Sequence, residues 1–216
     1  MAIIDFKKFK AVIFDMDGTM IDNMSFHRSA WKEFCSRKGI ELTDEDFKKK
    51  IAGFNNKQIF ENIFERQLPK DEIDELADRK ESVYRELYAP HIVEVSGLKD
   101  ILKIISELGI KQAIATTAVR LNRKFTLDAL GIEKYFSVIV GDEDVEKGKP
   151  HPEIYLKTAE KLDVKPEECL VFEDSHAGVA AAKAAGMQVV AVLTSHTREE
   201  LNGADYFIRN FSEIEI

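Results

Sequence analysis

Three aspartates fall within nine residues, in the segment FDMDGTMID at 14–22, directly behind an apolar run. Asp15 and Asp17 are two residues apart, so their side chains project to the same side of an extended backbone. Gly18 allows the chain to turn immediately behind them. In such a pair one carboxylate can act as a nucleophile while the other transfers a proton. The segment therefore indicates a chemical site at the end of a buried strand.

Further polar residues follow the later apolar runs. Thr116 and Thr117 end KQAIATT, Lys149 comes a few residues after FSVIVG, and Glu173 and Asp174 end CLVFED. Taken singly, a threonine after a strand is usually a helix cap, and a lysine before a proline is usually solvated. Clustered carboxylates, however, repel one another when buried, and a divalent cation relieves that repulsion. Because oxygen-only ligands suit Mg²⁺, these residues predict a magnesium-assisted aspartate nucleophile for phosphoryl transfer.

The elements that would position these residues alternate between strand and helix. Apolar runs predict strands at 10–15, 111–117, 136–141, 169–174, 189–193 and 204–208. Helical periodicity predicts helices at 98–108, 122–130, 152–162 and 175–185, and a capping box of Thr197 and Glu200 predicts a helix start at 197–202. Strands joined by single helices need crossovers, so the fold is α/β with a doubly wound, Rossmann-like parallel sheet. Ligands of such sheets bind at the carboxyl ends of the strands, where the polar residues lie.

A helical stretch interrupts this pattern between about 24 and 93. Residues 24–38 have an apolar helical face that includes Phe26, His27 and Trp31, and 55–66 and 70–88 are also amphipathic. Because the first strand belongs to the same sheet as the later ones, the helices form an insertion. We expect an α/β core domain made of 1–22 and 94–216, and a helical cap domain at 23–93.

Composition excludes several classes of function. The chain has 216 residues, of which 44% are hydrophobic and 32% charged, so it is globular. Its net charge of −8 repels nucleic acid and anionic membranes. Cys35 and Cys169 lack metal-ligand spacing and are expected to be buried, reduced thiols. No segment has the length of a membrane span or the apolar centre of a signal peptide. We expect a cytoplasmic monomer that binds neither nucleic acid nor membranes.

These motifs together resemble the haloacid dehalogenase superfamily, specifically its β-phosphoglucomutase-like branch. The resemblance rests on DMDGT at 15–19, Thr116 after a strand, Lys149 in GKPHPEIY and FEDSHAG at 172–178, in that order. The segment DNMSFHRSAW at 22–31 matches the start of the helical cap of that branch. The resemblance covers nearly the whole chain and implies a core sheet with a cap inserted after the first strand.

The resemblance also implies roles for individual residues. Asp15 would be the nucleophile, and Asp17 would protonate the leaving oxygen and deprotonate the incoming one. Thr116 would donate a hydrogen bond to the transferring phosphoryl group. Lys149 would neutralise that group, and it is preferred to its rival Lys147 because it lies in the Lys-Pro pair. The Mg²⁺ site would comprise Asp15, Asp17 through its backbone carbonyl, Glu173 and Asp174.

The substrate would contact residues at the cap and at the rim of the core. His27 has two interpretations, a core or interface histidine with a satisfied partner, or a link between cap closure and Asp17. The expected substrate-binding residues are Thr117, His27, Asn56, Lys80 and Arg120.

Two departures from the mutases of this branch favour a phosphatase over a mutase. Mutases place an arginine three residues after the cap glycine that matches Gly53, where this chain has Asn56. They also place a lysine after the threonine motif, where this chain has Val119. Lys80 does match a cap lysine of the mutases, and Lys57 or Arg120 can substitute for a missing cation. We expect a Mg²⁺-dependent phosphatase of small phosphorylated metabolites, chiefly sugar phosphates, with a β-phosphoglucomutase as the alternative.

Two other classes share parts of this pattern. A haloalkanoate dehalogenase uses the same first aspartate without a metal, but it would not need Asp17. A phospho-receiver domain has a phosphorylatable aspartate on a similar sheet, but it has no use for about 70 residues of cap. Turnover, as opposed to a single stoichiometric phosphorylation, distinguishes the receiver from an enzyme.

Overall fold

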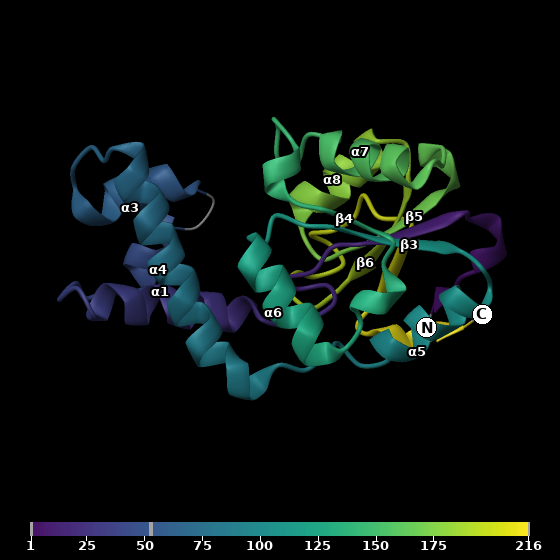
Figure 1. The fold of residues 1–216 in the computed structure, drawn as a ribbon, viewed down its shortest axis with the longest axis horizontal. Helices are drawn as coiled ribbons and strands as arrows, with labels where there is room; N and C mark the ends of the chain where they lie inside the picture. The colour runs from purple at the N-terminus through teal and green to yellow at the C-terminus, as the bar shows by residue number, and fades with distance from the viewer. Residues whose placement is uncertain (1, 52–53, 216) are drawn as a thin grey trace. The chain divides into compact units, whose positions relative to one another are not determined.

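The computed structural model describes residues 2–51 and 54–215 (Figure 1). The chain divides into two compact units. One consists of Met1–Met24 and Ile92–Ile216, and the other of Ser25–His91. Each unit has its own apolar core.

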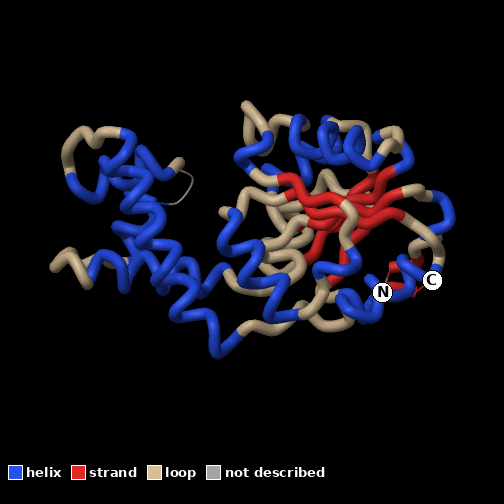
Figure 2. Tube along the Cα trace, in the orientation of Figure 1, coloured by secondary structure: helices blue, strands red, loops and turns tan. Residues whose placement is uncertain are grey.

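The larger unit is built on a parallel sheet, six-stranded in the described part of the chain, with the order β4-β3-β2-β5-β6-β7. Its strands are β2 (Ala11–Phe14), β3 (Lys111–Ala115), β4 (Val138–Val140), β5 (Cys169–Glu173), β6 (Gln188–Val192) and β7 (Tyr206–Ile208). After β2 the chain first adds β3 and β4 on one side of it and then β5, β6 and β7 on the other. The strand β2 is therefore flanked by β3 and β5. The carboxyl ends of these three central strands therefore lie next to one another at one edge of the sheet, whose strands are red in Figure 2. The doubly wound parallel sheet predicted from the sequence is confirmed.

Helices cover both faces of this sheet. They are α5 (Leu98–Glu107), α6 (Arg120–Leu130), α7 (Glu153–Leu162) and α8 (His176–Ala184). Right-handed crossovers place α5 and α6 on one face and α7 and α8 on the other (Figure 1). Because both faces are covered, β2 and β5 are buried along their whole length, which explains their uninterrupted apolar sequences.

The second unit is helical. It contains α1 (Met24–Ser36), α2 (Asp44–Asp46), the π-helical η2 (Phe47–Ile51), α3 (Asn56–Phe64) and α4 (Lys70–Tyr88). Trp31, Phe34 and Phe60 form the aromatic centre of its core. A capping box of Asn55 and Gln58 starts α3. None of the helices in 2–51 and 54–215 is both long and apolar enough to cross a membrane.

One local prediction differs from the structure, and one small sheet was not predicted. The capping box of Thr197 and Glu200 does form, with the Thr197 amide donating to Glu200 at 2.8 Å, but 198–203 is a turn. The Asn202–Gly203 pair follows within one turn and favours a chain reversal over helix. A second, two-stranded sheet, in which β1 (Ala2–Ile3) pairs in parallel with β8 (Ile214–Glu215), was not predicted.

The remaining short elements are single 3₁₀ turns. They are η1 (Phe6–Lys8), η3 (Ala89–His91), η4 (Glu133–Tyr135), η5 (Asp142–Asp144), η6 (Pro166–Glu168) and η7 (Phe211–Glu213). Of these, η5 lies in the segment that leads from β4 to Lys149.

Candidate active site

Asp15 and Asp17 lie just beyond the end of β2. The Asp15 amide still donates to the Phe172 carbonyl of β5 at 3.0 Å, so the strand geometry extends to this residue. The chain then turns at Gly18, whose φ is +79°. Asp15 is buried and Asp17 half-buried. The two carboxylates are therefore held by different contacts.

Asn23 holds the carboxylate of Asp17. Its Nδ2 donates to Asp17 Oδ1 at 2.8 Å, and its Oδ1 accepts from the Gly18 amide at 3.1 Å. Asn23 is fully buried. Asn23 was not predicted as a site residue, because an asparagine just before a helix is more typical of a cap. Here its amide group closes the turn that carries the Asp pair.

Lys149 is the centre of the charged cluster. Its ammonium group donates to Asp15 Oδ1 and Glu173 Oε1, each at 2.6 Å, and to the Ala115 carbonyl at the end of β3 at 3.2 Å. Lys147, the rival, is exposed. The structure thus brings Lys149, from the segment after β4, to the ends of β2, β3 and β5.

Glu173 is committed to protein donors. One of its oxygens accepts from Lys149 and from the Tyr155 hydroxyl at 2.8 Å. The other accepts from the amides of Asp174 and Ser175 at 2.9 and 3.1 Å and from the Ser175 hydroxyl at 3.0 Å. These bonds anchor Lys149 to the turn between β5 and α8. Tyr155, inside α7, was another residue that the sequence analysis did not identify.

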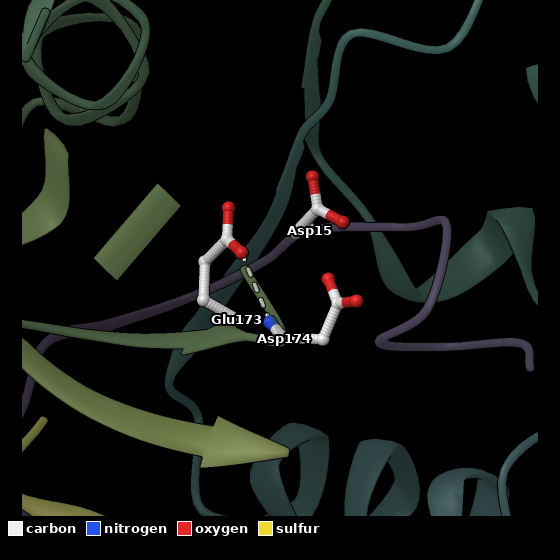
Figure 3. Close-up of side chains that lie close together, drawn as sticks. All are labelled: Asp15, Glu173 and Asp174. Atoms are coloured by element: carbon white, nitrogen blue, oxygen red, sulfur yellow. Dashed lines mark hydrogen bonds between the residues drawn. The ribbon is translucent and has the colours of Figure 1, made fainter. Parts of the chain in front are cut away.

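Asp15, Glu173 and Asp174 form the group among the described residues whose carboxylate oxygens could hold a metal ion, all within 4.8 Å of one another. Figure 3 shows the three side chains converging from the ends of β2 and β5. Three carboxylates facing one ammonium leave a formal charge of −2, which a divalent cation would balance. A donor set made only of oxygens suits Mg²⁺. The residues present therefore fit the expected magnesium ion.

The loop after β6 forms hydrogen bonds with the segments that carry Asp174 and Gly18. His196 Nδ1 lies 2.9 Å from the Asp174 carbonyl oxygen, to which it must donate because a carbonyl only accepts. The Thr194 hydroxyl donates to the Gly18 carbonyl, and the Thr19 hydroxyl donates to Asp174 Oδ1 at 3.3 Å. The loop after β6 thus contacts both segments that carry aspartates.

Burial governs the ionisation of these groups. It raises the pKa of Asp15 well above its ordinary value, although Lys149 works in the opposite direction. Burial, reinforced by the charge of Glu173, raises the pKa of Asp174 to about 6. Burial works to lower the pKa of Lys149, but the charges of Asp15 and Glu173 raise it well above its ordinary value. Lys149 is therefore an ammonium at neutral pH, and the aspartates need additional positive charge to ionise fully.

The predicted residues after β3 occupy different environments. Thr116 is buried, and its Oγ1 accepts from the Ala118 amide at 3.1 Å. Thr117 is exposed, as is Arg120 at the start of α6. Val119 is 40% exposed, so an apolar side chain lies at the position where the resemblance to the mutases implies a lysine.

The predicted cap residues belong to the helical unit. Lys80 is only 4% exposed, and its ammonium group lies 3.0 Å from His27 Nδ1 and 2.8 Å from Glu81 Oε1. The His27 ring stacks on Tyr84 with centroids 3.9 Å apart. His27 therefore has partners within its own unit, and its link to Asp17 stays a prediction. Asn56 is exposed at the start of α3, while Gly53, its reference position, lies outside the described residues.

The two cysteines fit the expectation of buried thiols. Cys35 and Cys169 are buried and form no disulfide with each other. Burial raises the pKa of Cys35 to about 11 and that of Cys169 to about 12, so both are protonated at neutral pH. Neither thiol lies in the charged cluster.

Comparison with known proteins finds relatives that match most of this chain. Residues 12–192 match the sequence model of the family described as haloacid dehalogenase-like hydrolase. A phosphorylated carbohydrates phosphatase of Thermotoga maritima is 35% identical over 83% of this chain and 82% of its own length. A β-phosphoglucomutase of Bacillus subtilis is 32% identical over 95% of this chain and 91% of its own length.

A solved structure extends the agreement to the fold. The crystal structure of a HAD hydrolase, family IA, variant 3, from Entamoeba histolytica superposes with a TM-score of 0.87. It is 32% identical and covers 96% of both chains. The family match, the relatives and the shared fold together show that this chain is a member of the haloacid dehalogenase-like hydrolase family of enzymes.

Proposed function

We propose that this protein is a Mg²⁺-dependent phosphatase of small phosphorylated metabolites, chiefly sugar phosphates, that acts through an aspartyl-phosphate on Asp15. The observation that carries the proposal is the convergence of Lys149, Glu173 and Asp174 on Asp15 at the carboxyl edge of the sheet. A cation and an ammonium beside one buried carboxylate suit a dianionic phosphoryl group. The T. maritima relative, named as a phosphatase of phosphorylated carbohydrates, supports the substrate class.

Each residue would have one task in the reaction. Asp15 attacks phosphorus, and the bond from phosphorus to the leaving oxygen breaks as Asp17 protonates that oxygen. Asp17 then takes a proton from water, which attacks the aspartyl-phosphate and releases inorganic phosphate. Lys149 and Thr116 hold the phosphoryl oxygens throughout. Asp15, Asp174 and the Asp17 carbonyl would hold Mg²⁺, which supplies positive charge to the same oxygens.

Glu173 has a different role in this scheme. Both of its oxygens already accept at least two hydrogen bonds from protein groups. We therefore assign it to orienting Lys149 and the turn that carries Asp174, so Glu173 is not a direct metal ligand. This assignment narrows the ligand set inferred from the sequence.

The helical unit Ser25–His91 would act as the cap that encloses the substrate and excludes bulk water. We propose that five residues contact the substrate or control closure of the cap over the core domain. They are Thr117, His27, Asn56, Lys80 and Arg120. A cap of this kind suits a small metabolite better than a protein or a nucleic acid. The net charge of −8 also opposes binding to nucleic acid.

The test is phosphate release by the purified protein from a panel of sugar phosphates and other phosphate esters. We expect multiple turnovers with Mg²⁺, loss of activity with a chelator, and recovery when Mg²⁺ is restored. Ca²⁺ should replace Mg²⁺ poorly, because its larger and looser coordination would misplace the phosphoryl oxygens. Full activity in excess chelator, or no ester hydrolysed with Mg²⁺, would contradict the proposal.

The alternative is a β-phosphoglucomutase, which the B. subtilis relative supports. Two observations favour the phosphatase. Lys80, the match to the cap lysine of the mutases, is buried against His27 and Glu81, and the apolar Val119 is exposed where a second cation would be needed.

The two activities are distinguished with β-glucose 1-phosphate and a trace of the 1,6-bisphosphate. Release of inorganic phosphate with little glucose 6-phosphate is expected. Glucose 6-phosphate appearing much faster than inorganic phosphate would instead establish the mutase.

A further inference from the structure

Arg123 of α6 connects two loops that border the active site. Its side chain is 9% exposed, and Nη1 donates to the Ala118 carbonyl and to Glu143, each at 2.9 Å. Nη2 donates to the second oxygen of Glu143. Ala118 lies in the loop after β3, two residues beyond Thr116, and Glu143 lies in η5, in the segment that leads to Lys149. The guanidinium group thus bridges the segments that carry the two proposed phosphoryl-binding side chains.

The contact between Arg123 and Glu143 is tightly packed against Gly141. A Cβ atom at Gly141 would lie 2.0 Å from Arg123 Nη1 and 2.2 Å from a Glu143 oxygen, so a side chain at the first residue after β4 would displace the Arg123–Glu143 contact. A forked contact between guanidinium and carboxylate fixes orientation as well as distance. The hydrogen bond from Arg123 also lowers the pKa of Glu143, which is therefore ionised at neutral pH.

The segment after β4 is fixed on its other side by α7. Asp144 pairs with Lys161 of α7 at 3.3 Å. Glu153, at the start of α7, accepts from the amides of Glu146 and Lys147 at 2.9 and 3.1 Å. This segment is consequently joined to α7 on one side and, through Arg123, to α6 and the loop after β3 on the other.

We propose that Arg123 and Glu143 are positioning residues that set the separation of Thr116 and Lys149 across the bound phosphoryl group. The proposal rests on the proposed function, because it assumes that both groups act on the phosphoryl oxygens. A misplacement of about 1 Å can lower a rate about a hundredfold. The proposed Mg²⁺ ligands lie on the segments after β2 and β5, outside the contacts given above for Arg123. Loss of the pair should therefore impair phosphoryl transfer and leave metal binding intact.

Arg123→Met tests this directly, since it removes the forked contact and retains much of the side-chain bulk. We expect kcat to fall about ten- to a hundredfold, with a smaller change in KM and an unchanged Mg²⁺ affinity measured by calorimetry. Arg123→Lys, which keeps the charge but not the fork, should recover part of the loss. Glu143→Gln should cause a partial loss, and combining it with Arg123→Met should add little, because both changes remove the same contact.

Lys124→Gln is the matched control. It removes an exposed ion pair with Asp128 on the same helix, and kcat should stay at the wild-type value. Arg123→Met could instead lower the melting temperature and still have the wild-type kcat at temperatures where it is folded. In that case the pair would be structural only and the proposal would be wrong.

A second readout separates this proposal from the proposed function. If the wild-type protein hydrolysed no ester, the function would fail while the pair could still be examined by hydrogen exchange. Amides in 117–119 and 141–149 should then exchange faster in Arg123→Met than in Lys124→Gln. Unchanged exchange in both loops would overturn the positioning role.

Discussion

Asp15 is buried beside one ammonium and two other carboxylates, so its charge is the feature on which the proposed chemistry depends. Asp15→Asn keeps the shape and removes the ionised oxygen. We expect phosphate release to fall about a thousandfold or more while the folded structure is retained. Asp22→Asn, the same change at an exposed position seven residues on, should keep wild-type activity. Near-normal turnover by Asp15→Asn would exclude the covalent mechanism.

Asn23 provides a test of how Asp17 is held. Asn23→Asp keeps the acceptor for the Gly18 amide but replaces the donor to Asp17 with a second carboxylate. We expect kcat to fall about ten- to a hundredfold at neutral pH. The loss should shrink at acidic pH, where one proton shared by the two carboxylates replaces the missing hydrogen bond. A pH-rate profile parallel to that of the wild type would show that Asn23 does not act through Asp17.

Residues at strand ends could be inferred from the sequence, whereas the residues that orient them could not. Four site residues end an apolar run or directly follow one, so the predicted sheet places them at the carboxyl ends of its strands. They are Asp15, Thr116, Glu173 and Asp174. Asn23, Tyr155 and Arg123 act through side-chain contacts between segments far apart in the chain. In the sequence they look like a helix cap, a core aromatic and a surface cation. Their roles depend on packing that no local pattern encodes.

At the scale of elements, the start of α8 is shaped around Glu173. A Cβ atom at Gly178, in the first turn of this helix, would lie 1.7 Å from a Glu173 oxygen. Gly178→Ala should therefore displace Glu173 and its bond to Lys149, although alanine in a helix is favoured over glycine by about 1 kcal/mol. We expect lower kcat and a lower melting temperature.

Gly203→Ala is the control for that change. The nearest neighbour of its added Cβ would lie at 3.5 Å, an ordinary contact. The control should keep wild-type activity. Equal effects of the two substitutions would show that the contact with Glu173 is not the cause.

The elements themselves were predictable to different degrees. The sheet strands were identified because buried parallel strands have uninterrupted apolar sequences. The pair β1 and β8 was missed because two-residue strands have no measurable periodicity. The capping box at 197–202 was identified correctly as a local contact, but a capping box lowers the free energy of a helix start without preventing the turn that Asn202–Gly203 favours.

At the scale of the whole molecule, the charged cluster links folding stability to pH. The pKa of Asp174 is about 6 in the folded protein and 3.8 for an ordinary aspartate, so the folded state binds this proton more tightly. The stability from this group is present below about pH 4 and is lost as pH rises through about 6, by about 3 kcal/mol at most. Asp15, whose pKa is also raised, acts in the same direction.

Mg²⁺ should reverse this loss, because it binds the ionised carboxylates and competes with protons. We expect Mg²⁺ to raise the melting temperature more at about pH 7.5 than at about pH 5, and its affinity to fall up to about tenfold per pH unit for each proton displaced. The measurement is thermal unfolding over a pH series with and without Mg²⁺. Asp174→Asn should respond little to Mg²⁺ and, without it, exceed the wild type in stability at about pH 7.5 but not at about pH 4. An equal effect of Mg²⁺ at both pH values would mean that the ion binds elsewhere.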